Sequence, residues 1–449
     1  MQHIHPKAKS FSQYKGICTD EILSEVEELA SQLQGTRILN INATAFGGGV
    51  AEILHNVVPL MLDLGIKASW DVLEAPPEFY DVTKKFHNGL QGAPITLSHE
   101  ELHLYEKVNR ANARTLGEYD LVYVHDAQPL FIKDTLSHNG DTQTKWAWRC
   151  HVDTSNPNEY LSRYLMPCIS MYDAAVYTMD QYVPSGLRAP VSIISPTIDP
   201  LDDKNKAMSV KEAARIVRGF GIDVDRPLLL QVSRFDPWKD PIGVIEAYRL
   251  VKKTYPDVQL ALVGSMASDD PEGWEQLAQV VACVDGDRDI FVLTNDDGVG
   301  AVEVNAFQRK AAVVIQKSTR EGFGLTVSEA LWKASAVVAG NVGGIPLQVQ
   351  HGVTGSLVSS IEECASMCIK VLQNPERSEK MALAGREHVR KNFLTPNILR
   401  DELKLFLRLL SERKAPALPV VDEPRETYKP IKRTWKKKAV EKVKPDSMF

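Results

Sequence analysis

Short runs of β-branched and apolar residues alternate with amphipathic helical patterns along almost the whole chain. This alternation is typical of parallel sheets flanked by helices, because each strand is followed by a crossover helix that covers the sheet. In the first half, the runs predict strands at residues 36–42, 67–73, 121–125, 145–151, 174–177 and 191–194. Helical patterns lie between them, for example at 50–64 and 100–116.

The segment 196–205 interrupts this rhythm with prolines and charged residues, and we interpret it as an inter-domain linker. The alternation then restarts, with predicted strands at 228–233, 259–264, 290–294, 313–316 and 336–339 and helices at 242–254, 274–284, 302–309 and 325–333. The pattern therefore predicts two consecutive doubly wound α/β domains, residues 1–200 and 201–395. A cleft between them is expected, since open α/β sheets bind ligands at the carboxyl ends of their strands.

The end of the chain departs from this pattern. A last helix at 397–410 is strongly apolar on one face, so the segment 396–412 is expected to pack back on the body. Residues 413–449 hold 11 Lys and Arg against 5 Asp and Glu, and they predict a disordered basic tail that could touch anionic surfaces. The other 412 residues carry a net charge of −12, which argues against nucleic acid as a partner.

Composition fits a globular protein: 449 residues, of which 44% are apolar, can build sizeable cores. No apolar run approaches the roughly 18 residues of a membrane span, and the N-terminus lacks the apolar segment of a secretory signal. Six cysteines are spread along the chain, and only Cys364 and Cys368 stand one helical turn apart. This usage is typical of free thiols in a reducing compartment. We therefore expect a cytoplasmic protein without membrane contact.

The first candidate motif is the glycine-rich segment 45–52, which follows a predicted strand and opens a helix. At Gly48 and Gly49, backbone N–H groups could approach a phosphate or a sugar at the positive end of the helix dipole. A tight turn with no ligand explains the segment equally well. It does not match the dinucleotide pattern G-x-G-x-x-G, which argues against a nicotinamide cofactor.

The second motif places Arg234 and Lys239 just after the first strand of the second half. Two fixed cations at a strand end suit a diphosphate, because arginine offers a bidentate fork and lysine a point charge. Surface charges on a loop are the alternative.

The third motif is the segment 318–334, in which a carboxylate and a glycine turn precede a helix that starts at about Leu325. The N–H groups of Gly322, Phe323, Gly324 and Leu325 would point at a bound anion. The carboxylates of Glu321 and Glu329 would lie roughly 12 Å apart if the whole stretch were helical. The two catalytic carboxylates of a glycoside hydrolase lie about 5–9.5 Å apart. Because Glu321 and Glu329 would be further apart, we expect them to bind different parts of one long ligand. A solvated helix position is the alternative for Glu329.

The fourth motif places His151 and Asp153 at the end of a first-half strand, ahead of a helix capped near Ser155 or Asn156. A histidine here could equally be structural, and an aspartate could be a helix cap or a turn residue.

Together, the four motifs resemble the retaining glycosyltransferase family 4, whose GT-B fold has two Rossmann-like domains that face a cleft. The resemblance covers residues 36–412. The family's E-x7-E motif corresponds to Glu321 and Glu329, and its Arg–Lys pair corresponds to Arg234 and Lys239. Its glycine loop corresponds to Gly48 and Gly49, and its strand-end histidine to His151. The segments 151–158, 233–241 and 318–333 are more narrowly similar to the trehalose glycosyltransferring synthases. These enzymes join an NDP-glucose to glucose reversibly and form α,α-trehalose.

The resemblance implies a role for each residue. Arg234 and Lys239 would stabilise the leaving diphosphate, and Glu329 would hold the ribose hydroxyls of the donor. Glu321 would bind hydroxyls of the transferred glucose, with the backbone of residues 322–325 supplying donors, and His151 would face the same glucose. Gly48 and Gly49 would close over the phosphates and the acceptor, and Asp153 would lie near the acceptor.

The resemblance also implies the ligands. The donor would be ADP-, UDP- or GDP-glucose, the acceptor glucose and the product trehalose, with no metal or cofactor required. A Mg²⁺ ion that assists the nucleotide is left open, as is a homodimer.

Three other functions stay open from the sequence. The chain could be a trehalose phosphorylase that uses inorganic phosphate, a transferase with another acceptor such as a lipid or a polysaccharide, or a silent nucleotide-sugar-binding protein. The absence of an amphipathic membrane helix counts against a lipid acceptor.

Overall fold

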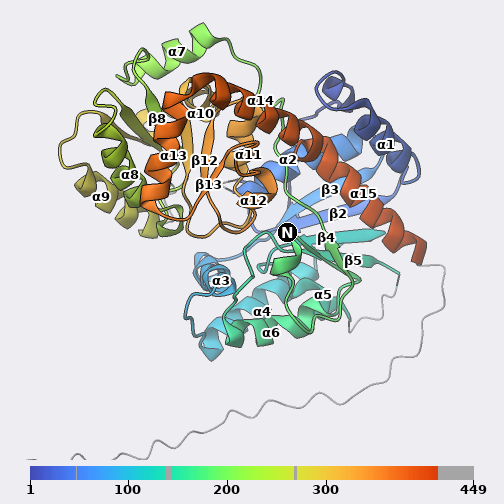
Figure 1. Ribbon diagram of the computed structural model, residues 1–449. Coiled ribbons are helices and arrows are strands. Elements are labelled where there is room, and N and C mark those ends of the chain that lie inside the picture. Colours follow the sequence, from blue (N-terminus) through green and yellow to red (C-terminus); the bar gives the residue numbers. More distant parts are fainter. Residues whose placement is uncertain (47, 138–142, 267–270, 413–449) are drawn as a thin grey trace, which may run out of the picture. The chain divides into compact units, whose positions relative to one another are not determined.

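The computed structural model describes residues 1–46, 48–137, 143–266 and 271–412 (Figure 1). The tail predicted at 413–449 lies outside the described residues. Residues 1–412 form one compact unit that contains two sheets.

The first sheet has seven strands in the order β1-β3-β2-β4-β5-β6-β7, all parallel except the β1–β3 pair. Its strands are β1 (Gln2–His3), β2 (Arg37–Asn42), β3 (Lys67–Val72), β4 (Leu121–His125), β5 (Lys145–Arg149), β6 (Ala174–Tyr177) and β7 (Val191–Ile193). The helices of this half are α1 (Asp20–Ser31), α2 (Gly49–Asp63), α3 (Pro77–Leu90), α4 (His99–Ala113), α5 (Ile132–Ser137) and α6 (Glu159–Ile169), with short 3₁₀ turns at Phe11–Tyr14 and Asp180–Tyr182.

The second sheet has six parallel strands in the order β10-β9-β8-β11-β12-β13. They are β8 (Leu228–Val232), β9 (Gln259–Val263), β10 (Ile290–Leu293), β11 (Val313–Gln316), β12 (Val337–Gly340) and β13 (Ser356–Val358). The helices are α7 (Val210–Gly219), α8 (Pro241–Lys252), α9 (Pro271–Val284), α10 (Ala301–Lys310), α11 (Leu325–Trp332), α12 (Ile345–Gln348), α13 (Ile361–Gln373) and α14 (Pro375–Asn392), with 3₁₀ turns at Pro237–Lys239 and Asn295–Asp297. The last helix, α15, spans Thr395–Ser411.

The prediction of two doubly wound sheets is confirmed, and each of the eleven predicted strands occurs, with ends shifted by at most two residues. The strands β1 and β13 are missing from the prediction. Both lie at sheet edges and have only two and three residues, so neither carries a readable alternation of apolar and polar positions.

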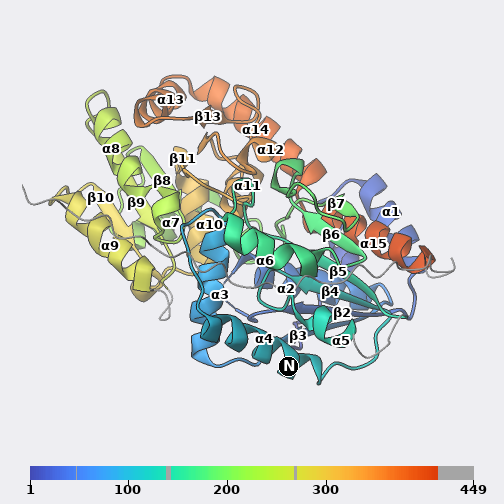
Figure 2. The same cartoon turned by 90° about the horizontal axis from the view of Figure 1, so that it is seen from below.

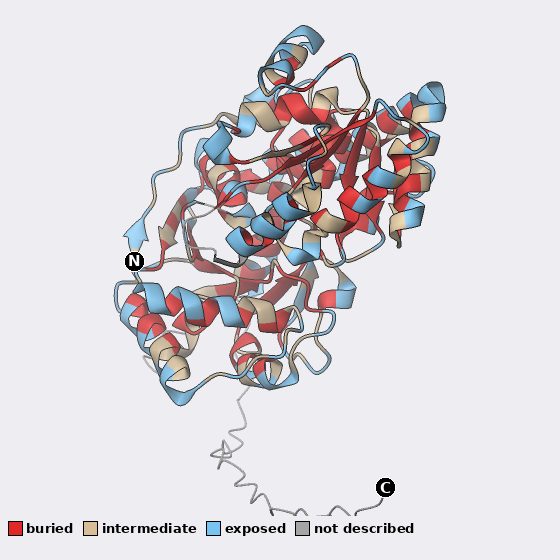
Figure 3. Ribbon diagram, turned by 90° about the vertical axis from the view of Figure 1, so that its left-hand side faces the viewer, coloured by how far each residue is buried: buried red, intermediate tan, exposed pale blue. Residues whose placement is uncertain are grey.

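Alternate residues of each buried strand face opposite helix layers, and the interior strands β4, β6, β8, β9, β11 and β12 are wholly buried (Figure 3). In the first sheet, α1, α2 and α15 pack on one face and α3, α4, α5 and α6 on the other. Figure 2 shows this second group of helices from its own side of the sheet. In the second sheet, α8, α9 and α13 cover one face, whereas α7, α10, α11 and α14 cover the other.

Helix α15 belongs to the core of the first sheet, although it follows the second sheet in the chain. Its apolar face is buried against α1, and the ring of Phe406 lies 5.4 Å from that of Tyr123 in β4. Arg149 at the end of β5 donates to Glu402 of α15 at 2.6 Å. Helix α15 therefore stabilises the first sheet, whose strands come from the N-terminal half of the chain.

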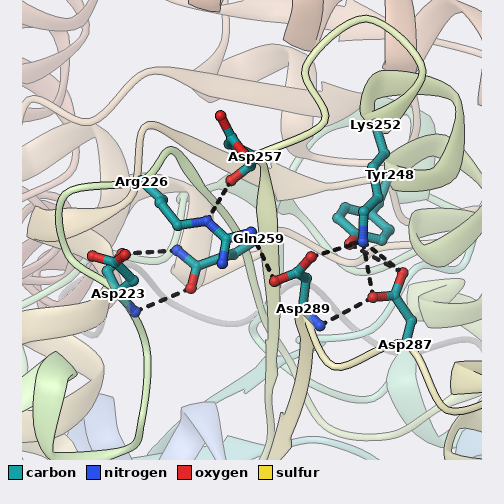
Figure 4. A network of polar contacts seen from close by, with 8 residues as sticks. All are labelled: Asp223, Arg226, Tyr248, Lys252, Asp257, Gln259, Asp287 and Asp289. Atoms are coloured by element: carbon teal, nitrogen blue, oxygen red, sulfur yellow. Dashed lines mark hydrogen bonds and ion pairs between the residues drawn. The ribbon is translucent and has the colours of Figure 1, made fainter.

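A polar network joins the segments just before strands β8, β9 and β10 (Figure 4). Arg226 donates to Asp289 at 2.7 Å, and Lys252 of α8 donates to Asp287 and Asp289 at 2.9 Å. Gln259 and Asp223 exchange two hydrogen bonds of 2.8 and 3.0 Å. These contacts fix the amino ends of the strands. The opposite, carboxyl ends carry the candidate site.

Candidate functional site

The candidate residues lie in or just after the loops that follow β2, β5, β8 and β11, and the loops after β4 and β12 contact them. A Cβ on Gly322, after β11, would lie 2.9 Å from the carbonyl oxygen of His151, after β5. A Cβ on Gly49, in the first turn of α2, would lie 3.3 Å from Leu325. Together with the contact between Lys239 and Glu321 described next, these contacts bring all four sequence motifs, from both halves of the chain, together. Gly47 of the glycine loop lies outside the described residues.

Lys239 and Glu321 form an ion pair within the site. The Lys239 Nζ donates to Glu321 Oε2 at 2.5 Å, and the hydroxyl of Ser318 donates to the same oxygen at 3.2 Å. Gln231 of β8 anchors the lysine backbone by donating to the Lys239 carbonyl at 2.7 Å. The sequence predicts both charged residues for one ligand, but not that they contact each other. Arg234, by contrast, is about half exposed and lies 3.2 Å from Asp236.

The loop between Glu321 and α11 is anchored through its carbonyl groups. The Tyr182 hydroxyl lies 2.9 and 3.0 Å from the carbonyl oxygens of Glu321 and Gly322, and Gln348 donates to the carbonyl of Phe323 at 2.5 Å. The predicted helix start at Leu325 is confirmed, with Gly324 as the N-cap at φ +87°. Because the first N–H groups of a helix have no partner within it, this end of α11 is suited to an anion.

Gly343, in the loop after β12, lies directly against this segment. A Cβ on Gly343 would lie 1.7 Å from the Glu321 carbonyl oxygen, and its φ of +52° disfavours any other residue. The backbone that carries Glu321 is thus held by close packing as well as by hydrogen bonds.

Glu329 is buried in the second turn of α11, with 2% of its surface exposed. Its Oε1 lies 3.4 Å from Lys204 Nζ, and the same lysine donates to Glu52 of α2 at 2.8 Å. Its Oε2 is buried and has no hydrogen-bond partner among the residues that the structure describes. A cavity of about 280 Å³ adjoins these groups and is lined by Glu52, Lys204, Leu325 and Glu329, among others. A buried carboxylate oxygen without a donor is suited to a ligand hydroxyl.

Sequence reasoning missed Lys204 and Glu52. Lys204 lies in the segment 196–205, which the sequence assigns to a linker, and Glu52 lies in the first turn of α2 next to the glycine loop. The contacts of Lys204 with Glu329 and with Glu52 depend on how α2, the segment 196–205 and α11 lie relative to one another, which spacing along the sequence does not show.

His151 contacts two residues that the sequence analysis did not single out. Its ring Nε2 lies 3.0 Å from Nδ1 of His125, and its backbone N–H donates to Asp126 at 2.8 Å. Burial, together with the charge of Arg149 and the ring of His125, lowers the pKa of His151 well below its usual range. Burial raises the pKa of Asp126 to about 6. The sequence does contain a signal for His125, because this residue ends a predicted strand in the same way as His151.

Asp153 is buried and accepts a hydrogen bond from the backbone N–H of Ser155 at 2.9 Å, as a turn residue does. The helix expected to be capped near Ser155 or Asn156 instead begins at Glu159, where the side chain of Asn158 caps the N–H of Leu161. That expectation is wrong because Asp153 closes a separate turn, so that the chain enters the helix later. A contact of Asp153 with an acceptor stays a prediction.

Over the described residues, no three His, Cys, Asp or Glu side chains gather as ligands for a metal ion. Within the same residues, no helix combines the length and the apolar character that crossing a membrane demands.

Comparison with known families matches both halves of the chain. Residues 40–184 match the model of the trehalose synthase N-terminal domain, and residues 213–388 match that of glycosyl transferases group 1. A trehalose synthase of Rubrobacter xylanophilus is 52% identical over 415 residues, which cover 91% of this chain and 99% of that protein. A trehalose phosphorylase of Pleurotus pulmonarius is more distant, at 28% identity, and this chain covers 52% of its length.

Among solved structures, the sucrose-phosphate synthase of Thermosynechococcus elongatus superposes with a TM-score of 0.67 over 84% of this chain and 100% of that one. At 17% sequence identity, this likeness concerns the fold alone. It agrees with the two parallel sheets and confirms the expected GT-B architecture. With its two matched domains and a 52% identical relative of nearly the same extent, the chain belongs to the trehalose synthase family of GT-B glycosyltransferases.

Proposed function

We propose that this protein is a retaining glucosyltransferase that forms α,α-trehalose reversibly from NDP-glucose and glucose. The observation that supports this most strongly is the pairing of Lys239 with Glu321 at the start of α11. A cation, a sugar-binding carboxylate and a helix N-terminus meet there. This combination suits a substrate that carries a sugar hydroxyl group beside a diphosphate.

Charge stabilisation is the main task of the site, since an NDP-sugar already has a good leaving group. Negative charge develops on the diphosphate as the bond from the glucose anomeric carbon to the phosphate oxygen breaks. In this proposal Lys239, Arg234 and the first N–H groups of α11 meet that charge. They supply positive charge without a resident metal or cofactor, and a Mg²⁺ ion carried by the nucleotide would add to it.

The two ends of the donor are held by different carboxylates. Glu321 accepts hydrogen bonds from hydroxyls of the transferred glucose, with His151 on the same sugar. Glu329 accepts from the ribose through Oε2, the oxygen that has no hydrogen-bond partner within the described chain. Positioning by these groups aligns the anomeric carbon with the acceptor hydroxyl.

Retention follows if the acceptor attacks from the face that the diphosphate leaves. A bond forms between the acceptor oxygen and the anomeric carbon while the bond to the phosphate oxygen breaks. The acceptor proton passes to that departing oxygen. No side-chain nucleophile is needed, and the α configuration is kept.

Replacing Glu329 with alanine is expected to weaken donor binding by about 10- to 100-fold, which corresponds to the loss of about 1.5–3 kcal/mol for a hydrogen bond to a charged group. The value of kcat should change less, because the ribose lies away from the reacting atoms. Calorimetric titration with UDP, ADP and GDP measures the effect, with the matched variant Glu329→Gln as an intermediate case. Unchanged nucleotide affinity in Glu329→Ala would remove this residue from the donor site.

The reaction itself is tested by incubating the protein with NDP-glucose and [1-¹³C]glucose and following the anomeric signals by NMR. A product with both anomeric carbons in the α configuration supports the proposal. A β linkage at the transferred unit would contradict retention, and transfer only to another acceptor would contradict trehalose as the product.

A further inference from the structure

A row of buried polar side chains continues from the ring of His151 into the first sheet. His125 is the last residue of β4, and its Nδ1 lies 3.0 Å from His151 Nε2. The two rings are stacked, with their centroids 5.3 Å apart and an interplanar angle of 25°. On its other side, His125 Nε2 lies 3.3 Å from Oδ1 of Asn40 in β2. Both His125 and Asn40 are 1% exposed. The strands β2, β4 and β5 are neighbours, so the row crosses the sheet.

The direction of these hydrogen bonds follows from Asn40. Its side-chain Nδ2 donates to the backbone carbonyl of Ser69 at 3.4 Å, so the oxygen Oδ1 faces His125 and can only accept. His125 must therefore carry a hydrogen on Nε2. A neutral imidazole with hydrogen on Nε2 has a bare Nδ1, which can only accept. The Nε2 of His151 must then be the donor, and its Nδ1 keeps a lone pair.

Both imidazole rings are neutral near pH 7, because their surroundings lower the pKa of each. Burial and the nearby charge of Arg149 lower the pKa of His125 well below its usual range. The pKa of His151 is lowered by burial, by Arg149 and by His125. The carboxyl of Asp126 contacts the backbone N–H of His151.

We propose that His125 is a positioning residue, which fixes His151 in the tautomer with its hydrogen on Nε2 and thereby presents the His151 Nδ1 lone pair to a hydroxyl of the bound sugar. The inference rests on the proposed function, in which His151 faces the transferred glucose. In the other tautomer the same position would carry an N–H group. That group could donate to a sugar oxygen but could not accept a hydroxyl hydrogen.

The tautomer is measured first, on the substrate-free wild-type protein. Protein labelled with ¹⁵N-histidine is examined by long-range ¹H–¹⁵N NMR, and the signals of His151 are identified by their loss in His151→Gln. The inference predicts a protonated Nε2 and an unprotonated Nδ1 at pH 7. Hydrogen on Nδ1, or on both nitrogens, would overturn it.

A matched pair of variants then tests the consequence. His125→Gln keeps both an acceptor for His151 and a donor for Asn40, whereas His125→Phe keeps a ring but neither polar group. His125→Phe is expected to lose about 10- to 100-fold in kcat, the range found when the partner that orients a ligating histidine is removed. His125→Gln should recover most of that loss, and the nucleotide affinity should stay constant in both.

Equal kcat in His125→Phe and wild type would overturn the positioning role. Should His125→Phe fail to fold, the NMR experiment on the wild type still decides the tautomer. The two proposals are also separable. A protein that shows the expected tautomer but no transfer from any NDP-glucose would contradict the proposed function alone.

Discussion

Replacing Lys239 with methionine is expected to lower kcat for trehalose formation by about 10²- to 10³-fold, the cost of removing one preorganised donor from developing charge. The physical reason is the position of Lys239 Nζ, 2.5 Å from Glu321 and beside the N-terminus of α11. At that place the ammonium group can meet both the sugar-binding carboxylate and the departing diphosphate. Initial-rate measurements at saturating donor and glucose give the effect directly.

A second cause of lost activity must be separated from the first. Without Lys239, the buried carboxylate of Glu321 has no cationic partner among the residues that the structure describes, and the uncompensated charge could disturb the loop. The double variant Lys239→Met/Glu321→Gln removes that charge. If Lys239 acts on the diphosphate, the double variant stays at least as slow as the single one. Recovery of kcat in the double variant would show that Lys239 only neutralises Glu321.

The conservative variant Lys239→Arg provides the control for charge, and Lys211→Met on α7 provides one for a lysine away from the site. Lys239→Arg should retain more activity than Lys239→Met, because a cation remains. Lys211→Met should behave as the wild type. Near wild-type kcat in Lys239→Met would contradict the assignment of the site.

The largest expected effect on stability lies at the buried ion pair between β5 and α15. Glu402→Leu should lower the free energy of unfolding by about 3–5 kcal/mol, because it leaves Arg149 charged and buried without its partner. Both side chains are at most 2% exposed, and Arg149 Nη1 donates to Glu402 at 2.6 Å. The hydrogen bond from Arg149 to the carbonyl of Ile194 at 3.2 Å involves a neutral acceptor and cannot compensate the charge. Denaturant unfolding of the variant and the wild type measures the difference.

The double variant Arg149→Met/Glu402→Leu distinguishes a lost pair from lost packing. It removes both charges and should regain most of the stability that Glu402→Leu loses. Lys404→Met, on the same helix, removes a half-exposed partner of Glu25 and should cost less than about 1 kcal/mol. A double variant as unstable as the single one would show that the helix interface, and not the orphaned charge, sets the cost.

Much of the fold could be predicted from sequence because its signals are local. Parallel strands that are buried on both faces read as apolar runs, and β4, β6 and β11 occur where those runs lie. The helix start at Leu325 was predictable because a glycine turn precedes an apolar helical pattern. Edge strands such as β13 leave too short a run to read.

The candidate site was predictable only in part, because strand ends indicate which residues share an edge but not which of them touch. Lys239 and Glu321 were assigned to one ligand, yet their direct contact depends on β8 and β11 being neighbours in the sheet. The sequence places Arg149 in a strand but does not indicate its partner, because Glu402 lies 253 residues further along the chain. His125 carried the same signal as His151, a histidine at a strand end, and its importance emerges only from the pairing of β4 with β5.

The most direct test of the whole account is the reverse reaction. Trehalose is incubated with the protein and ADP, UDP, GDP or inorganic phosphate in parallel, and free glucose, sugar nucleotide and glucose 1-phosphate are measured. We expect glucose and NDP-glucose with at least one nucleotide and no reaction with phosphate alone. Glucose 1-phosphate formed from trehalose and phosphate, without any sugar nucleotide, would contradict it and would make the protein a phosphorylase.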